Sequence, residues 1–369
     1  MTKPHLKALG AVLTLALLAG CQPPPPIKLG FVGGLSDSNS DNGQAGQNAV
    51  ILAVEQINRE GGIQGRQVEL LSKDDAQDKA QAARAARELV EARVEAVIGP
   101  FTSSMAAAIV PITGQAGILQ VSPTITAMDF HGKDDNLFRI NRTTRDNARD
   151  YARVMTGLGQ RRIAVAYDVR NRTFSESWLR EFKAAATERG AALAAEAPFE
   201  SGPGADFEAV VGKMVAANPD SLFFIAGALD VARLAQQARK QAPRLPIGAS
   251  EWAATEQLID LGGEVVQGLL IVQNFDRDDT SPRFKAFSEA YFKRFQRNPG
   301  YSSVSAYDAA TVVLKALKER REGETLKAAA LRSGPYEGLQ QRISFDANGD
   351  TDRKVFFTEI RDGRYVRIK

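Results

Sequence analysis

The stretch Ala96-Val97-Ile98-Gly99-Pro100-Phe101-Thr102-Ser103-Ser104 joins an apolar run to an alanine-rich segment through a glycine-proline break. Gly99-Pro100 stops a strand, and we expect Ser103 or Ser104 to cap the helix that follows. The unpaired N–H groups at such a helix start, together with the helix dipole, favour an anion. The stretch therefore predicts a strand, a tight turn and a helix that begins beside an anion site.

A second turn of this kind, Val121-Ser122-Pro123-Thr124-Ile125-Thr126, follows the next apolar run. In an open α/β sheet both turns lie at the carboxyl ends of strands, where ligands bind. Their hydroxyl and backbone groups suit a carboxylate beside an ammonium. Ser103, Ser104, Thr124 and Thr126 are therefore candidate ligand-binding residues. The alternative is that both turns are ordinary caps without a ligand.

Apolar runs and longer amphipathic segments alternate along the rest of the chain. This alternation predicts βαβ units and parallel sheets, and because it restarts at Arg162 it predicts two similar α/β lobes. The expected strands are 27–32, 68–71, 96–98, 118–121, 163–167, 193–197, 222–225 and 269–273, and the expected helices are 44–59, 79–91, 103–116, 176–189, 207–217, 231–241, 282–295 and 303–320. A terminal hairpin is expected around Asn348-Gly349 and Asp362-Gly363.

The composition is that of an ordinary globular protein, with 44% hydrophobic and 25% charged residues in a chain of 369. A formal net charge of +3 argues against a nucleic-acid binder, which needs a basic face. Two histidines and one cysteine leave little for a metal cluster or a Cys–His pair, so no metal and no cofactor are expected. A hydrolase that used Ser103 would lack a nearby base, because His131 is expected in an exposed loop.

The N-terminal segment has the features of a secretory signal. Basic residues precede a short apolar run, and Leu18-Ala19-Gly20-Cys21 ends that run. These four residues resemble the lipobox of bacterial lipoproteins, which implies cleavage before Cys21 and attachment of lipid to its sulfur. We therefore expect residues 1–20 to be a signal peptide and residues 21–26 to be a lipidated cysteine with a proline-rich linker. The alternative is an ordinary signal peptide with a chance cysteine.

The order and spacing of several motifs resemble those of the branched-chain amino acid (Leu/Ile/Val) periplasmic binding proteins of ABC importers. The likeness covers nearly the whole mature chain, and the matching stretches are Ile27–Gly33, Ala53–Asn58, Gly61–Gly65, Lys73–Asp78, Gly99-Pro100 with Ser103, Gly117–Leu119 with Ser122–Thr124, and Gly262-Gly263 with Gly268. The resemblance implies an α/β, two-lobed, type I periplasmic-binding-protein fold. Each lobe is then a mostly parallel sheet flanked by helices, with three crossovers at the hinge. It places lobe 1 at 27–142 and 276–345, and lobe 2 at 143–275 and 346–369.

The resemblance also implies roles for individual residues. Ser103 would hold the ligand carboxylate through its hydroxyl and N–H, and Thr126 would contact both the carboxylate and the ammonium. Thr124 falls where the family offers a backbone carbonyl to the ammonium. Glu251 matches the second-lobe carboxylate that pairs with the ammonium, and Phe174 falls where relatives have a tyrosine that covers the ligand.

Some positions depart from the family pattern. The loop 36–42 lacks the usual tyrosine near Gly43, and an aromatic residue near Gly227 is missing. Asp37, Asn42 or Asp308 could therefore favour a polar ligand, or could be solvated surface residues. Trp252 is expected either to form a wall of the cleft or to be a buried structural residue.

These observations together predict a lipid-anchored solute-binding protein rather than an enzyme. It would capture a branched-chain or other small amino acid by hinge closure outside the cytoplasm, as a monomer, and deliver it to an ABC permease complex. One alternative is a sensor or scaffold of the same fold that binds an amide, an aromatic acid or a cell-wall fragment. A repressor of similar fold is countered by the signal sequence and by the lack of an N-terminal DNA-binding unit.

Overall fold

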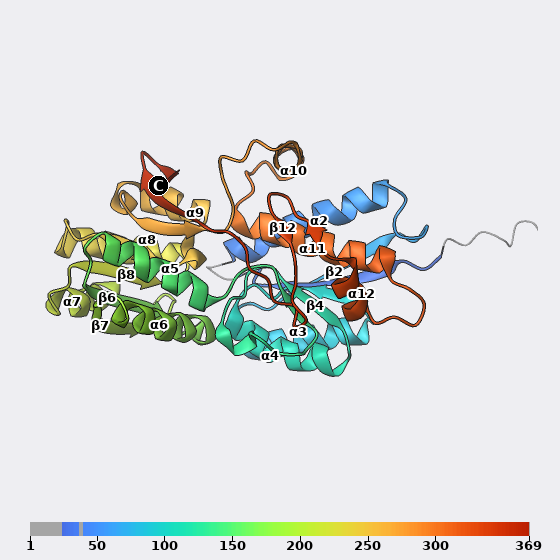
Figure 1. Cartoon of the computed structure of the whole chain (residues 1–369), viewed down its shortest axis with the longest axis horizontal. Helices are drawn as coiled ribbons and strands as arrows, with labels where there is room; N and C mark the ends of the chain where they lie inside the picture. The colour runs from blue at the N-terminus through green and yellow to red at the C-terminus, as the bar shows by residue number, and fades with distance from the viewer. Residues whose placement is uncertain (1–23, 37–39, 369) are drawn as a thin grey trace, which may run out of the picture.

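The computed structural model describes residues 24–36 and 40–368. The predicted signal sequence, the lipidation site at Cys21 and the candidate Asp37 lie outside these residues. Two α/β lobes with separate sheets lie side by side along the long axis of the molecule (Figure 1). In the part of the chain that the structure describes, every helix is too short or too polar to cross a bilayer.

Lobe 1 is built on a fully parallel five-stranded sheet in the order β2-β1-β3-β4-β5. Apolar side chains of β1 alternate between two cores, one under α2 and α11 and the other under α3 and α4. The elements of lobe 1 are β1 (Ile27–Gly33), α2 (Asp41–Arg59), β2 (Val68–Asp74), α3 (Lys79–Glu91), β3 (Ala96–Ile98), α4 (Ser103–Gln115), β4 (Leu119–Ser122), the 3₁₀ turn η1 (Met128–Phe130), β5 (Leu137–Arg139), α10 (Pro282–Phe295), α11 (Tyr301–Glu319), α12 (Leu326–Ser333), and the small pair β11 (Tyr336–Glu337) and β12 (Arg342–Ile343).

Lobe 2 is built on a seven-stranded sheet in the order β14-β13-β10-β9-β8-β6-β7. Strands β6 to β10 are parallel, and the terminal hairpin β13–β14 adds two antiparallel strands at one edge. The elements of lobe 2 are α5 (Thr144–Gly157), β6 (Arg162–Asp168), α6 (Arg172–Thr187), β7 (Ala192–Phe199), α7 (Phe207–Ala216), β8 (Ser221–Ile225), α8 (Ala228–Gln241), β9 (Ile247–Ala249), η2 (Glu251–Ala253), α9 (Glu256–Gly262), η3 (Gly263–Val266), β10 (Leu270–Gln273), β13 (Phe356–Arg361) and β14 (Arg364–Arg367).

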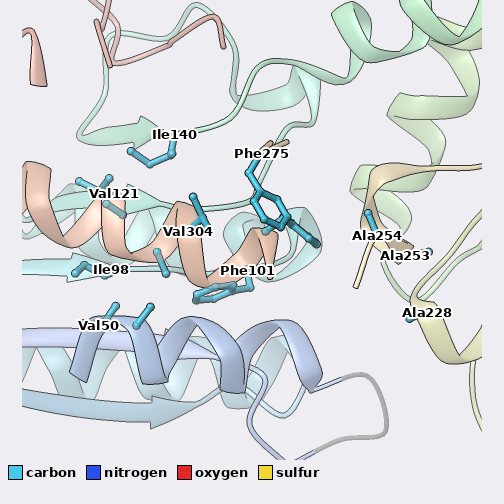
Figure 2. Packing of buried hydrophobic residues seen from close by; sticks show 14 of the residues in the cluster. Val50, Ile98, Phe101, Val121, Ile140, Ala228, Ala253, Ala254, Phe275 and Val304 are labelled. Carbon is cyan, nitrogen blue, oxygen red and sulfur yellow. The ribbon is translucent and has the colours of Figure 1, made fainter. Parts of the chain in front are cut away.

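The chain passes between the lobes three times, between β5 and α5, between β10 and α10, and between β12 and β13. This is the expected α/β fold with three crossovers. The exact residues at which one lobe ends and the other begins, 142/143, 275/276 and 345/346, stay predictions. One apolar cluster continues from lobe to lobe: Figure 2 shows Phe101 and Val304 of lobe 1 in the same cluster as Ala253 and Ala254 of lobe 2.

Most predicted elements agree with the structure, but several elements were not predicted. No element was expected at β5, β9, α9 or α12, nor between 143 and 161, where α5 lies with Ala148, Tyr151 and Met155 buried on one face. Asn348-Gly349 forms a turn in the third crossover rather than a hairpin between strands, because β12 ends at Ile343 and β13 begins only at Phe356. The carbonyl of Gly349 accepts a hydrogen bond from the N–H of Arg139 at 2.9 Å. The terminal hairpin turns only at Asp362-Gly363.

Buried charges hold the third crossover to lobe 1. Asp350 accepts a hydrogen bond from Nε of the fully buried Arg139 at 2.7 Å, and its other oxygen lies 2.7 Å from Nδ1 of His131. His131 is an exposed loop residue, as predicted, with 37% of its side chain exposed. The sequence left Asp308 open as either a residue for a polar ligand or a solvated surface residue, and the structure excludes the second. Its carboxylate is fully buried and lies 2.8 Å from Nη2 of Arg353.

Removing one partner of the Asp308–Arg353 pair is expected to destabilise the protein. Asp308→Ala leaves a guanidinium buried without its counter-charge, which costs about 3–5 kcal/mol of unfolding free energy. Urea denaturation measures this loss. Asp352→Ala is the matched control, because Asp352 belongs to the same crossover and its side chain is 89% exposed. Equal unfolding midpoints for the two variants would contradict this account of the crossover.

Candidate functional site

The two hydroxyl-bearing turns of lobe 1 are fixed to each other by side chains of one strand face. Gln120 donates to the carbonyl of Gly99 at 2.9 Å, Ser122 to that of Pro100 at 2.7 Å, and Thr124 to that of Phe101 at 2.6 Å. Gln120 and Ser122 are alternate residues of β4 and point to the same side of the strand, and Thr124 follows in the bend after Pro123. The turn before α4 is therefore held in place by hydrogen bonds to three of its successive carbonyl groups.

The N-cap side chain of α4 leaves the helix start uncapped, and of the first backbone N–H groups that of Ser104 donates to Oδ1 of Asn171 in lobe 2. The N-cap is Thr102, not Ser103 or Ser104 as expected, and it makes no side-chain cap. The Thr102 hydroxyl instead donates to Oε1 of Gln77 at 3.0 Å. An uncapped helix start carries unsatisfied N–H groups and the positive end of the helix dipole. This part of lobe 1 therefore favours a negatively charged ligand group.

Glu251 lies at the carboxyl end of β9, where η2 begins. Its Oε1 accepts from Nδ2 of Asn147 at 2.9 Å, and its Oε2 accepts from the indole N–H of Trp178 at 3.0 Å. Burial raises the pKa of this carboxyl, and the two side-chain hydrogen bonds act in the opposite direction. Each carboxylate oxygen can accept a further bond. Glu251 is therefore held rigidly and can still receive a cationic donor.

Ser103, Thr124, Phe174, Glu251 and Trp252 line a single small pocket between the lobes. The sequence placed all five in the ligand site, and the structure brings them together from both lobes. The other lining residues are Phe101, Thr102, Asn171, Asn274 and Tyr301.

Two buried polar atoms of this pocket have no hydrogen-bond partner within the described residues. They are Oγ of Ser103, from lobe 1, and Oδ1 of Asn274, from the second crossover. A buried polar atom without a partner costs about 1–3 kcal/mol, so such atoms usually meet a ligand or water. Ser103 Oγ beside the helix start suits a carboxylate, and Asn274 Oδ1 suits an N–H donor.

The other two predicted residues, Ser104 and Thr126, lie outside this lining. Ser104 bridges the lobes instead: its backbone N–H donates to Oδ1 of Asn171 at 3.1 Å, and its Oγ accepts from the N–H of Thr173 at 3.2 Å. Thr126 is buried, and its carbonyl accepts from the N–H of Thr144 at 2.8 Å. Its hydroxyl has no partner within the described residues, and its contact with a ligand remains a prediction.

Aromatic rings form the rest of the pocket wall. Phe174 and Trp252 pack edge to face, with centroids 5.7 Å apart, so Trp252 is a wall of the cleft. Phe101 lines the pocket from lobe 1, and its ring packs against two positions where only glycine leaves enough space. A Cβ at Gly46 would overlap the Phe101 ring, and one at Gly33 would come within 2.9 Å of it.

Sequence reasoning missed four polar residues of the lining, Thr102, Asn171, Asn274 and Tyr301. Asn274 directly follows β10, and Asn171 lies between β6 and α6. Both obey the rule that ligands bind at the carboxyl ends of parallel strands, which the sequence analysis applied only to lobe 1. Tyr301 begins α11 after a turn and had no such signal.

The groups that line the pocket therefore match the two charged ends of a small zwitterion. Lobe 1 offers a helix start and a free hydroxyl to an anion, and lobe 2 offers a buried carboxylate to a cation. Within residues 24–36 and 40–368 no cluster of His, Cys, Asp and Glu could hold a metal ion. Two hinged lobes that enclose such a pocket define a class, the solute-binding proteins.

Comparison with known proteins places the chain in this class. Residues 26–364 match the family model described as periplasmic binding protein, and the chain belongs to that family. A leucine-, isoleucine-, valine-, threonine- and alanine-binding protein of Pseudomonas aeruginosa is 26% identical over 331 residues, 88% of this chain and 87% of that protein. The Leu/Ile/Val-binding protein of Escherichia coli K12 is 25% identical over 91% of this chain and 93% of its own length.

Solved structures agree with this assignment. The branched-chain amino acid transporter substrate-binding protein LivJ of Streptococcus pneumoniae, in complex with isoleucine, has a TM-score of 0.84 and 26% identity and covers 93% of this chain and 100% of its own. The leucine-binding protein LivK of Thermotoga maritima has a TM-score of 0.85 and 25% identity, over 93% of this chain and 98% of its own. The relatives are solute-binding proteins, and this chain is a binding protein rather than an enzyme.

The bonds that Ser104 makes to lobe 2 are expected to support lobe closure. Asn171→Ala removes the acceptor of the Ser104 N–H and should weaken ligand affinity about fivefold, the value of one hydrogen bond. Calorimetry measures the change. Arg172→Ala, at the next position, is the control, because its exposed side chain forms an ion pair with Glu176 of the same helix and does not line the pocket. Unchanged affinity for Asn171→Ala would exclude this role.

Ligand affinity is expected to fall as the pH falls. An ammonium needs Glu251 ionised, but burial raises the pKa of this carboxyl above its ordinary value, so in the free protein it takes up a proton at a higher pH than an exposed glutamate. Below that raised pKa, binding must release the proton, and affinity drops by up to about tenfold per pH unit. Titrations from pH 7.5 down to pH 4.5, the ordinary value for a glutamate, check this. A dissociation constant that stays the same down to pH 4.5 would be the contrary result.

Proposed function

We propose that this protein captures a free α-amino acid between its lobes and delivers it to an ABC permease. The observation that carries the proposal is that Ser103 and Glu251 line one pocket from opposite lobes. The ligand carboxylate bonds to the Ser103 hydroxyl and the N–H groups at the start of α4. The ammonium bonds to Glu251, with Asn274 Oδ1 beside it. No bond of the ligand is broken.

Charge complementarity at both ends explains why closure would follow binding. Neither lobe alone offers both an anion site and a cation site. A ligand held only by lobe 1 gains its ammonium contacts when lobe 2 closes, and charge-assisted hydrogen bonds contribute about 1.5–3 kcal/mol each in a water-excluded site. Ligand binding therefore favours the closed arrangement by the difference in contacts between the two states.

The relatives guide the choice of amino acid and of compartment. Branched-chain amino acids are the first candidates, since the similar proteins named above bind them. Phe101, Phe174 and Trp252 supply apolar surface for such side chains. In the proposed cellular arrangement, lipid on Cys21 anchors a monomer outside the cytoplasm beside its permease, with residues 22–26 as the spacer.

Glu251→Gln is expected to remove amino-acid binding and to keep the fold. The amide has nearly the shape of the carboxylate but no charge for the ammonium, so affinity should fall at least about thirtyfold. The amide oxygen can keep the bond from Trp178, and the amide NH2 can donate to Oδ1 of Asn147 once that side chain turns over, so the unfolding temperature should change little. Isothermal titration of a panel of free amino acids and a thermal melt measure both effects.

The control for this variant is Glu264→Gln, which changes an exposed glutamate of the same lobe. It should bind and unfold like the unmodified protein. If no free amino acid in the panel binds to the unmodified protein, the proposed ligand class is wrong. If an amino acid binds equally well to Glu251→Gln, the ammonium site lies elsewhere.

A further inference from the structure

A second and much larger cavity, here called the outer cavity, lies between the lobes beside the inner pocket. Its volume is about 1100 Å³, against about 20 Å³ for the pocket, and Tyr301 lines both spaces. A space of 10–15 Å³ by this measure holds about one water molecule, and small-molecule sites usually span about 300–1,000 Å³. The outer cavity therefore has the room for a ligand side chain that the closed inner pocket lacks.

Two amide side chains of the outer cavity, one from each lobe, keep a buried polar atom without a partner. Asn42 of α2 is only 6% exposed, which excludes a solvated surface residue. Its Oδ1 accepts a hydrogen bond from the hydroxyl of Ser302, but its Nδ2 has no partner among the described residues. Oε1 of Gln257, from α9, likewise has none within 24–36 and 40–368. Such atoms are costly to bury unless a ligand or water reaches them, so one donor and one acceptor await a partner here.

Contacts between the lobes bring these two amides to the same part of the cavity. Ser302, which bonds to Asn42, belongs to the first turn of α11, whose N-cap is Gly300. Glu256 precedes Gln257 in α9, and a Cβ at Gly300 would lie only 2.9 Å from Oε2 of Glu256. The start of α9 in lobe 2 therefore packs against the start of α11 in lobe 1. Asn42 and Gln257 approach this contact from opposite lobes.

The unpartnered atoms and the charges of the lining select the chemistry of the group that fits. A cation would bring N–H donors to the unpaired N–H donor of Asn42. An anion would meet the carboxylates of Asp41, Glu256 and Asp260 against the single guanidinium of Arg297. A primary carboxamide is neutral and has both a carbonyl acceptor and an NH₂ donor. It therefore matches one unpaired amide with its oxygen and the other with its nitrogen.

We propose that the protein also binds α-amino acids whose side chains end in a primary carboxamide, with that amide in the outer cavity. This inference rests on the proposed function, because the α-carboxylate and α-ammonium keep their places at Ser103 and Glu251. The methylene groups of the side chain pass the ring of Tyr301. The terminal carbonyl accepts from Nδ2 of Asn42, and the terminal NH₂ donates to Oε1 of Gln257. The amide thus links the two lobes and favours closure.

Calorimetric titration of the purified protein with glutamine, norleucine and glutamate tests the inference. Glutamine and norleucine have unbranched side chains of similar length, and only glutamine ends in an amide. Glutamine should bind at least about fivefold more tightly than norleucine, the value of one net hydrogen bond. Glutamate has the shape of glutamine but a negative charge, so the carboxylates of the lining should make it bind more weakly than glutamine.

Two variants test the two amides separately. Gln257→Met keeps the length of the side chain without its acceptor, and Asn42→Leu keeps the approximate shape without its donor. Each should reduce the advantage of glutamine over norleucine about fivefold. If Asn42→Leu does not fold, because Ser302 loses its acceptor, Gln257→Met decides alone. Gln236→Met is the matched control, since Gln236 is exposed on α8 of the same lobe and lines neither space.

The outcomes separate this inference from the proposed function. If leucine binds but glutamine binds no more tightly than norleucine, the inference is wrong and the proposed function stands. The same holds if glutamate binds as tightly as glutamine, or if Gln257→Met keeps the full advantage of glutamine. If none of leucine, norleucine and glutamine binds, the proposed function fails and this inference fails with it.

Discussion

The cleft depends on a charge arrangement that neither lobe completes alone. The start of α4 has no side-chain cap and presents N–H groups with the Ser103 hydroxyl. Across the boundary, Glu251 is buried and held by Asn147 and Trp178. A helix start attracts an anion, and a buried carboxylate attracts a cation. A zwitterion satisfies both at once, and it can do so only when the lobes are together.

Hydrogen bonds behind the start of α4 and behind Glu251 fix the positions of these two ligand-binding groups. On the lobe 1 side, Gln120, Ser122 and Thr124 fix the turn before α4. On the lobe 2 side, the hydroxyl of Tyr151 donates to the carbonyl of Ala249 at 2.5 Å and accepts from the N–H of Val272 at 2.7 Å, which ties β9 to β10 just before Glu251. The polar groups that meet a ligand are therefore positioned before it arrives, which lowers the entropy cost of binding.

Local signals made much of the fold predictable, and long-range contacts limited the rest. Helices α3 and α10 have the predicted bounds because Asp78 and Ser281 cap them through side-chain bonds to nearby N–H groups. Ser103 was found because it follows a strand. The partners of Glu251 lie 104 and 73 residues away in the sequence, so no spacing rule reveals them. Asp308 has a carboxylate that could serve a ligand, and only the fold shows that Arg353 occupies it.

The most direct test of the central claim is a binding measurement in which each charged end of the ligand is blocked in turn. Calorimetry would compare leucine with leucine methyl ester, which lacks the carboxylate, and with N-acetyl-leucine, which lacks the ammonium. If the cleft grips both ends of a zwitterion, leucine binds and both derivatives lose affinity by at least about a hundredfold, since each leaves a buried charged or polar group unpaired. Binding of either derivative as tight as that of leucine would contradict the account.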